Sequence, residues 1–290
     1  RNERPLEEYE TLVRALPDEV YTLDAEGIIT SMLPPTDQER TTTGYQPEEL
    51  EGEPIDVLME DDDVDFGKQL IVDLLTSIDT EDVRAVSFEG AGDRAFCAGA
   101  DITGFADIEP AKQADPSELY EVVDEFPRPT VAKIQGFCLG GGFELALACD
   151  PRVATEDSRF GFPEINLGLL PGGGGTQRAL RMVGEARAKE LVFRGEHITA
   201  ERAENWGLIN RAVPEDEYED TCEEFLSDLV QGPPVALKHA KRVMNEGADE
   251  DLDAGLQMES QAFALLLTTE DAKEGAAAFQ EDRDPDFRGE

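Results

Sequence analysis

Residues 136–150 of the chain read GFCLGGGFELALACD, and within them three consecutive glycines, at 140–142, open an apolar stretch. Glycines at the start of a helix let the backbone approach a ligand closely and leave uncapped amides that point outward. Because the amino end of a helix favours negative charge, the segment predicts a site for an anion or a developing oxyanion. Glu144 follows Gly141 by three residues, so its carboxylate is expected on the same face of the helix.

Two further glycine-containing segments flank this one: residues 94–101 read RAFCAGAD, and residues 160–176 read FGFPEINLGLLPGGGGT. Neither glycine run ends in Gly-Lys-Ser/Thr, as a phosphate loop does, and neither fits the dinucleotide fingerprint. A backbone amide from the first segment can complete a two-donor oxyanion hole, and Glu164 can supply a second carboxylate. Composition alone supports a second interpretation, because 66 acidic residues among 290 place a solvated glutamate near almost any site.

In their order and spacing, the three segments resemble the signature of the crotonase superfamily, and most closely that of the enoyl-CoA hydratases. The tail at 271–279, DAKEGAAAF, fits the same pattern, so the resemblance covers residues 78–290. It implies an α/β fold, a crotonase-like spiral of ββα units with C-terminal helices. It also implies assembly as a homotrimer or hexamer.

The resemblance assigns roles to individual residues of this chain. It implies that the amides of Ala98 and Gly141 form the oxyanion hole, and that Glu144 and Glu164 are the catalytic acid and base. The remaining substrate-binding residues implied are Gly99, Ala100, Asp101, Gly140, Gly142 and Gly172. The implied reaction is hydration of trans-2-enoyl-CoA thioesters to 3-hydroxyacyl-CoA, a lyase step of fatty acid β-oxidation. The substrate carries coenzyme A, and no other cofactor is expected.

The first 77 residues follow a different pattern. Apolar residues at helical spacing over 6–16 predict a helix that Pro17 ends, and residues 20–31 predict a β-hairpin. The strings YTLDAEGII at 21–29 and GYQPEELEG at 44–52 resemble the start of a PAS sensor domain, so residues 17–77 read as a truncated, PAS-like α+β segment. Two alternatives to an enzyme therefore stay open: a PAS-linked acyl-CoA-binding or signalling module without turnover, and a non-functional fusion of truncated modules.

The junction between the two halves carries no linker. Residues 65–77 predict a helix with one apolar face, formed by Phe66, Leu70, Leu74 and, just beyond it, Ile78. Because independent domains are normally joined by a linker, we expect this helix to pack on the core that follows it, with the domain boundary at 77/78.

The charge balance is strongly acidic, with 66 Asp and Glu against 25 Lys and Arg and a net charge of −41. Repulsion among so many negative charges destabilises the folded state in dilute buffer, and salt screens this repulsion. We therefore interpret the composition as haloarchaeal in type, that of a cytoplasmic protein adapted to molar salt. No basic stripe predicts a nucleic-acid partner, and no apolar run predicts a membrane span. Four scattered cysteines and two histidines argue against a metal site.

Overall fold

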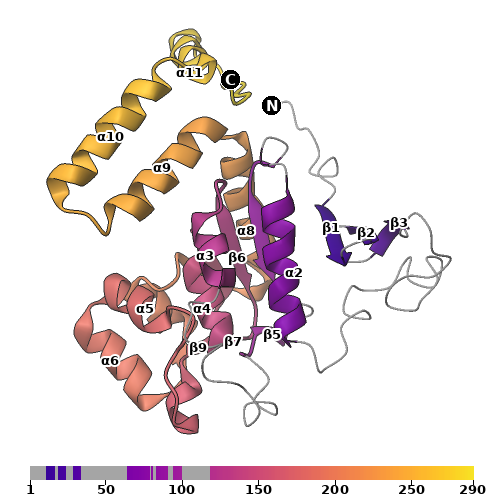
Figure 1. Ribbon diagram of the computed structural model, residues 1–290, viewed down its shortest axis with the longest axis vertical. Coiled ribbons are helices and arrows are strands. Elements are labelled where there is room, and N and C mark those ends of the chain that lie inside the picture. The colour runs from indigo at the N-terminus through magenta and orange to yellow at the C-terminus, as the bar shows by residue number, and fades with distance from the viewer. Residues whose placement is uncertain are drawn as a thin grey trace. The chain divides into compact units, whose positions relative to one another are not determined.

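The structure is a computed structural model that describes residues 11–16, 19–23, 29–33, 64–78, 80, 83–90, 94–99 and 118–290, with side chains from residue 71 onward. The chain divides into two compact units (Figure 1). The first comprises residues 1–78 and 101–107, and the second comprises residues 79–100 and 108–290.

The described part of the first unit begins with a three-stranded antiparallel sheet of order β1-β2-β3. Its strands are β1 (Thr11–Leu16), β2 (Glu19–Leu23) and β3 (Ile29–Leu33). The hairpin predicted over residues 20–31 is confirmed, because Leu23 pairs with Ile29. The helix predicted over 6–16 is wrong: Thr11 pairs with Leu23, and ladder hydrogen bonds to β2 outweigh a weak local helical preference. The PAS-like string at 44–52 lies outside the described residues.

The same unit contains helix α2, which spans Val64–Ser77 and confirms the helix predicted over 65–77. Val72 and Leu75 on this helix are buried. The packing of α2 on the following core stays a prediction, and the Discussion gives its test.

The second unit holds two four-stranded sheets, of order β11-β8-β6-β4 and β10-β9-β7-β5. The first contains β4 (Val86–Glu89), β6 (Thr130–Ile134), β8 (Arg152–Thr155) and β11 (Arg211–Val213). The second contains β5 (Ala95–Cys97), β7 (Phe137–Leu139), β9 (Arg159–Gly161) and β10 (Ile198–Thr199). From β4 to β9, successive strands thus alternate between the sheets, and a helix follows each of the pairs β4/β5, β6/β7 and β8/β9. This is the repeated ββα unit that the resemblance implies.

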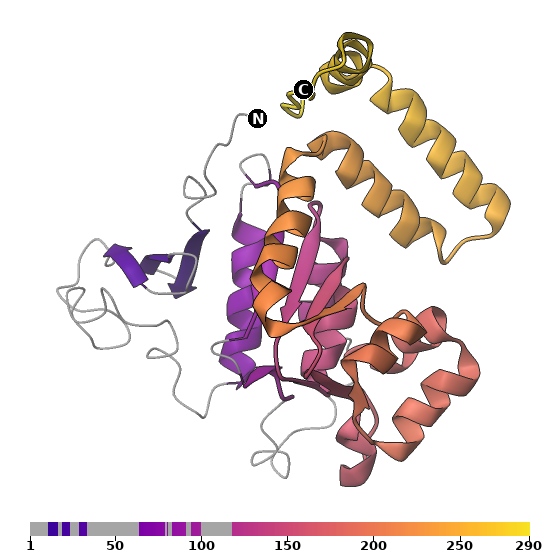
Figure 2. The same ribbon diagram turned by 180° about the vertical axis from the view of Figure 1, so that it is seen from behind.

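The helices of this unit are α3 (Glu118–Glu125), α4 (Gly141–Ala148), α5 (Gly175–Val183), α6 (Glu185–Arg194), α7 (Ala200–Trp206), α8 (Glu215–Gln231), α9 (Pro234–Gly247), α10 (Leu252–Leu266) and α11 (Glu270–Glu281), with a 3-10 turn η5 (Pro163–Leu167). Figures 1 and 2 show α9 and α10 side by side, with α10 on the side of α9 away from the sheets. In the part of the chain that the structure describes, no helix has the length and apolar character needed to cross a bilayer.

The core of the unit is built around α4, which is apolar on nearly every side. Phe143 on this helix stacks on Phe162 with ring centroids 4.9 Å apart and lies 5.4 Å from the ring of Phe160. All three rings are fully buried. Aromatic pairs of this kind hold the amino end of α4 against β9 and the segment that follows it.

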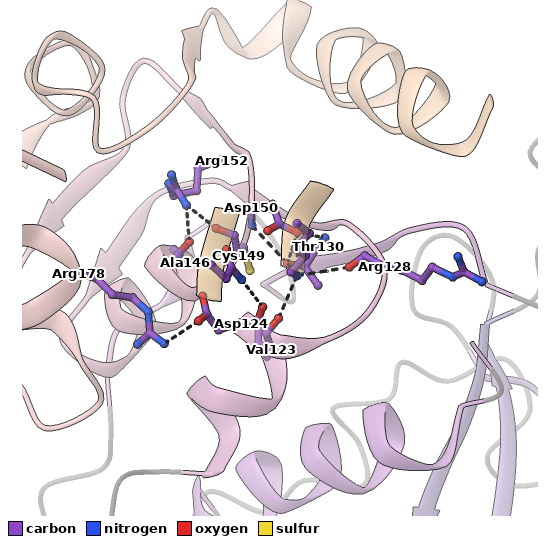
Figure 3. Close-up of polar contacts among 11 residues, drawn as sticks. Val123, Asp124, Arg128, Thr130, Ala146, Cys149, Asp150, Arg152 and Arg178 are labelled. Carbon is purple, nitrogen blue, oxygen red and sulfur yellow. Dashed lines mark hydrogen bonds and ion pairs between the residues drawn. The ribbon is translucent and has the colours of Figure 1, made fainter. Parts of the chain in front are cut away.

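Polar contacts hold the carboxyl end of α4 (Figure 3). The buried Arg152 side chain donates through Nη1 to the carbonyl oxygen of Cys149 at 2.5 Å and to that of Ala146 at 3.3 Å, which satisfies carbonyls that the helix leaves free. Next to it, Asp150 accepts hydrogen bonds from the backbone and hydroxyl of Thr130 at 2.7 and 3.1 Å. Both ends of α4 are therefore fixed.

Candidate active site

The amino end of α4 meets the loop after β5. Gly140 has φ +53° and Gly99 has φ +104°, which are backbone conformations that favour glycine. A Cβ placed on Gly99 would lie 3.9 Å from the backbone nitrogen of Gly141, so the two glycine segments touch at this point. Gly141 is the first residue of α4, and its amide therefore has no partner within the helix. The amide of Gly141 therefore lies at the point where the two segments touch.

Glu144 stands one turn further along α4 with only 3% of its surface exposed. Its Oε1 accepts hydrogen bonds from the backbone amides of Gly173 and Gly175 at 2.7 and 2.8 Å. Amide donors of this kind stabilise a negative charge on a buried carboxylate. Only glycine fits at 175, because a Cβ there would lie 2.6 Å from the ring of Phe162. The glycine run before α5 therefore forms a cradle for Glu144.

Glu164 lies in η5 and faces the same helix end. Its Oε1 would lie 3.1 Å from a Cβ on Gly140, while its Oε2 is buried and has no hydrogen-bond partner among the described residues. Burial raises the pKa of Glu164; a hydrogen bond from its own backbone amide opposes the shift, and the charge of Glu144 adds to it. Two carboxyl groups with such different surroundings can take the separate roles of charged base and proton carrier.

The other residues proposed from the sequence fall into three groups. The loop after β5 and the amino end of α4 bring together Ala98, Gly99, Gly140 and Gly141. Gly142 is buried and packs against Cys97. A Cβ on Gly142 would lie 2.2 Å from the carbonyl oxygen of Cys97, so the structure gives Gly142 a packing role. Gly172 is exposed and faces open space. Ala100 and Asp101 lie outside the described residues.

Sequence reasoning missed two residues at this site, Tyr120 on α3 and Arg178 on α5. The ring of Tyr120 lies on the Cα of Gly173, where a Cβ would come within 2.0 Å of it. Arg178 donates through Nη1 to the carbonyl oxygen of Gly173 at 3.1 Å, and Figure 3 shows its ion pair with Asp124 at 3.8 Å. Tyr120 lies far from the glycine run at 172–175 in the sequence, so no local signal marks it. Arg178 lies five residues after Gly173, and this proximity to the run is the signal that could have indicated it.

A fold of ββα units whose glycine-rich helix end faces two carboxyl groups defines a crotonase-like enzyme. The enoyl-CoA hydratase/isomerase family model matches residues 67–290. The chain belongs to this family, and the resemblance predicted over 78–290 is confirmed.

Individual relatives agree with the family model. A short-chain-enoyl-CoA hydratase from Clostridium acetobutylicum is 39% identical over 206 residues, which cover 70% of this chain and 79% of that protein. A 2,3-dehydroadipyl-CoA hydratase from Escherichia coli is 41% identical over 198 residues, which cover 68% and 78%. The crystal structure of an enoyl-CoA hydratase from Bacillus anthracis aligns with a TM-score of 0.71 at 38% identity, over 77% of this chain and 88% of that one.

Proposed function

We propose that the protein hydrates trans-2-enoyl-CoA thioesters to 3-hydroxyacyl-CoA. The observation that carries the proposal is the placement of two carboxyl groups at the glycine-rich end of α4. Glu144 is held by two backbone amides, and Glu164 keeps one oxygen atom unpartnered within the described residues. The names of two relatives, a short-chain-enoyl-CoA hydratase and a 2,3-dehydroadipyl-CoA hydratase, support the same reaction.

The proposed chemistry distributes charge between the helix end and the two carboxyl groups. Water adds at C3 of the enoyl group, a proton adds at C2, and negative charge develops on the thioester oxygen as an enolate. The amides of Ala98 and Gly141 donate to that oxygen, and each such donor contributes about 3 kcal/mol. Glu144, held by two backbone amides, orients the attacking water. Glu164, whose pKa is raised by burial, gives its proton to C2 and takes up the proton that the water loses.

The proposed function also implies which ligand the protein binds. The substrate is an acyl-CoA, which brings its own coenzyme A, and the two carboxyl groups and two amides require no other cofactor. We place the enzyme in cytoplasmic fatty acid β-oxidation and propose a homotrimer or hexamer as its assembly.

Two other functions compete with the hydratase: an isomerase and an acyl-CoA-binding module. Assays with acyl-CoA thioesters distinguish them. An isomerase moves a proton between carbons and needs one carboxyl group, so the retained pair favours a hydratase. An acyl-CoA-binding module needs neither. The assay mixes the full chain with crotonyl-CoA in molar potassium chloride and follows loss of the conjugated thioester absorbance, with product identified by mass as a gain of one water.

The same assay with 3-butenoyl-CoA separates the hydratase from the isomerase. A hydratase gives the hydrated product from crotonyl-CoA. An isomerase converts 3-butenoyl-CoA into crotonyl-CoA without hydrating it. Binding of either thioester without conversion contradicts the proposed function and favours the binding module.

A further inference from the structure

The hydroxyl of Tyr120 stands beside the first residue of α4. The Tyr120 side chain comes from α3 and is 6% exposed. A Cβ placed on Gly141 would meet the Tyr120 hydroxyl at 3.0 Å, its one contact within 4 Å among the described residues outside its chain neighbours and its own helix backbone. This hydroxyl therefore bounds the space beside the Cα of Gly141, the residue whose amide opens α4.

Within the described residues, no hydrogen bond engages the side-chain hydroxyl of Tyr120. Tyr120 accepts one hydrogen bond through its backbone carbonyl oxygen, from Arg178 Nη2 at 3.4 Å, but its hydroxyl has no partner among the described residues. An oxygen atom of a bound ligand can therefore accept a hydrogen bond from it.

The protonation state of Tyr120 suits a donor. Burial raises its pKa, and the charge of Glu144 adds the next contribution, followed by Cys97 and Glu164, while Arg178 opposes the shift. The hydroxyl therefore keeps its proton at neutral pH. A neutral donor beside two carboxyl groups favours an acceptor that starts as a neutral carbonyl and gains charge during the reaction.

The ring position is set by the same loop that holds Glu144. The ring lies on the Cα of Gly173, whose amide donates to Glu144 and whose carbonyl oxygen accepts from Arg178. Arg178 in turn reaches the backbone of Tyr120. A donor held by packing and by hydrogen bonds before the ligand arrives is preorganised for electrostatic stabilisation.

We propose that the hydroxyl of Tyr120 is a third donor to the thioester oxygen of a bound acyl-CoA, alongside the amides of Gly141 and Ala98. The proposal rests on the proposed function in one respect, that the ligand is an acyl-CoA thioester. It makes Tyr120 a catalytic residue, because its hydroxyl touches the oxygen on which the enolate charge develops.

The test measures carbonyl polarisation directly in Tyr120→Phe, which removes only the hydroxyl. Butanoyl-CoA labelled with ¹³C at the thioester carbon binds without reacting, and the shift of the bound carbon reports the hydrogen bonds to its oxygen. We expect the downfield shift seen in the wild-type protein to be smaller in Tyr120→Phe. Turnover of crotonyl-CoA should fall about 100-fold, the lower end of the loss on removing one oxyanion donor, with a smaller change in KM.

The matched control is Tyr218→Phe, which removes a buried tyrosine hydroxyl on α8, where Tyr218 packs with Val153 and Cys222. This control should leave both the carbon shift and the turnover at wild-type values. An unchanged carbon shift in Tyr120→Phe overturns the proposal even if turnover falls, because a structural role alone would then explain the loss.

The carbon shift also separates this proposal from the proposed function. If the wild-type protein binds butanoyl-CoA but fails to hydrate crotonyl-CoA, the proposed hydratase function is contradicted. The carbon shift in Tyr120→Phe still tests whether the Tyr120 hydroxyl donates to the thioester oxygen. If the wild-type protein does not bind butanoyl-CoA, the donor proposal is overturned.

Discussion

The side-chain oxygen Oε1 of Glu144 accepts a 2.7 Å hydrogen bond from the backbone nitrogen of Gly173 and so joins α4 to the loop that precedes α5. The bond links two glycine-rich segments that lie far apart in the sequence. The glycine run at 172–175 therefore has a role distinct from ligand binding, because its amides donate hydrogen bonds to a side chain of the protein itself. The charge of Glu144, in turn, contributes to the raised pKa of Glu164.

The first prediction concerns turnover. Glu144→Gln and Glu164→Gln should each lower the rate of crotonyl-CoA hydration by about 10²–10⁴-fold, the usual effect of losing one acid–base group. Both variants should remain folded, which circular dichroism checks. Glu185→Gln on α6 is the control, because Glu185 is exposed and pairs with Lys189 away from the site. Near-native turnover in either active-site variant would remove that carboxyl group from the mechanism.

The second prediction follows from the raised pKa of Glu164. Between the unfolded and the raised folded pKa, the folded protein binds more protons, so the stability contributed by this residue is lost as pH rises through that window. Glu164→Gln should therefore gain stability relative to the wild type as pH rises to neutral, and the gain should vanish on acidification. Melting temperatures of both proteins across this pH range in molar salt give the comparison.

Glu185→Gln supplies a control of opposite sign. A hydrogen bond from Lys189 lowers the pKa of Glu185, so its contribution is present above the unfolded pKa and is lost as pH falls. Its replacement should lower stability at neutral pH and have no effect in acid. A gain at neutral pH from both substitutions would mean that the burial of Glu164 is not the cause.

The third prediction concerns the cradle of Glu144. Gly173→Ala places a Cβ 2.0 Å from the ring of Tyr120 and should destabilise the protein by about 1–3 kcal/mol, as overpacking does. Gly172→Ala meets nothing within 4 Å and should change stability by less than about 0.5 kcal/mol. Urea unfolding of both variants in molar salt measures the difference. Equal stabilities would mean that the ring of Tyr120 can move away from Gly173 at little cost.

The sequence predicted the parts of the site that carry local chemical signals. A glycine run followed by Glu144 identified both the helix end and the first carboxylate, and the spacing of the three segments identified the family. The cradle of Glu144 and the hydroxyl of Tyr120 depend on how β9, η5 and α3 bring distant residues together, so no local pattern indicates them. The opening helix failed for the same reason, since strand pairing with residues 19–23 decided the conformation of residues 11–16.

The fourth prediction is that stability rises with salt. Helix α8 shows the cause, because it presents a series of exposed carboxylates and has no cation of its own: Glu215, Asp216, Glu217, Glu219, Asp220, Glu223, Glu224 and Asp228. Like charges at i,i+4 repel, and the Debye length shortens from about 10 Å at 0.1 M salt to about 3 Å at 1 M. The melting temperature should therefore increase from dilute buffer to molar potassium chloride.

A charge-reversed variant tests the origin of the salt effect. Asp220→Lys replaces a carboxylate that has like charges one turn away on both sides, Asp216 and Glu224, and its melting temperature should depend less on salt than that of the wild type. Equal melting temperatures of the wild type at low and high salt would contradict the interpretation that −41 units of charge need screening.

The fifth prediction assigns α2 to the core that follows it. The family model begins at residue 67, inside α2, so the family pattern includes most of this helix. Its buried Val72 and Leu75 would be costly to expose, since each large buried side chain contributes about 1.5–3 kcal/mol. Deleting residues 1–64 should leave a soluble protein with weak activity, whereas deleting residues 1–77 should leave an insoluble one. Soluble yield and thermal melting of both truncated chains in molar salt decide the matter. If the shorter chain folds as well as the longer, the helix belongs to the amino-terminal unit and the boundary lies after it.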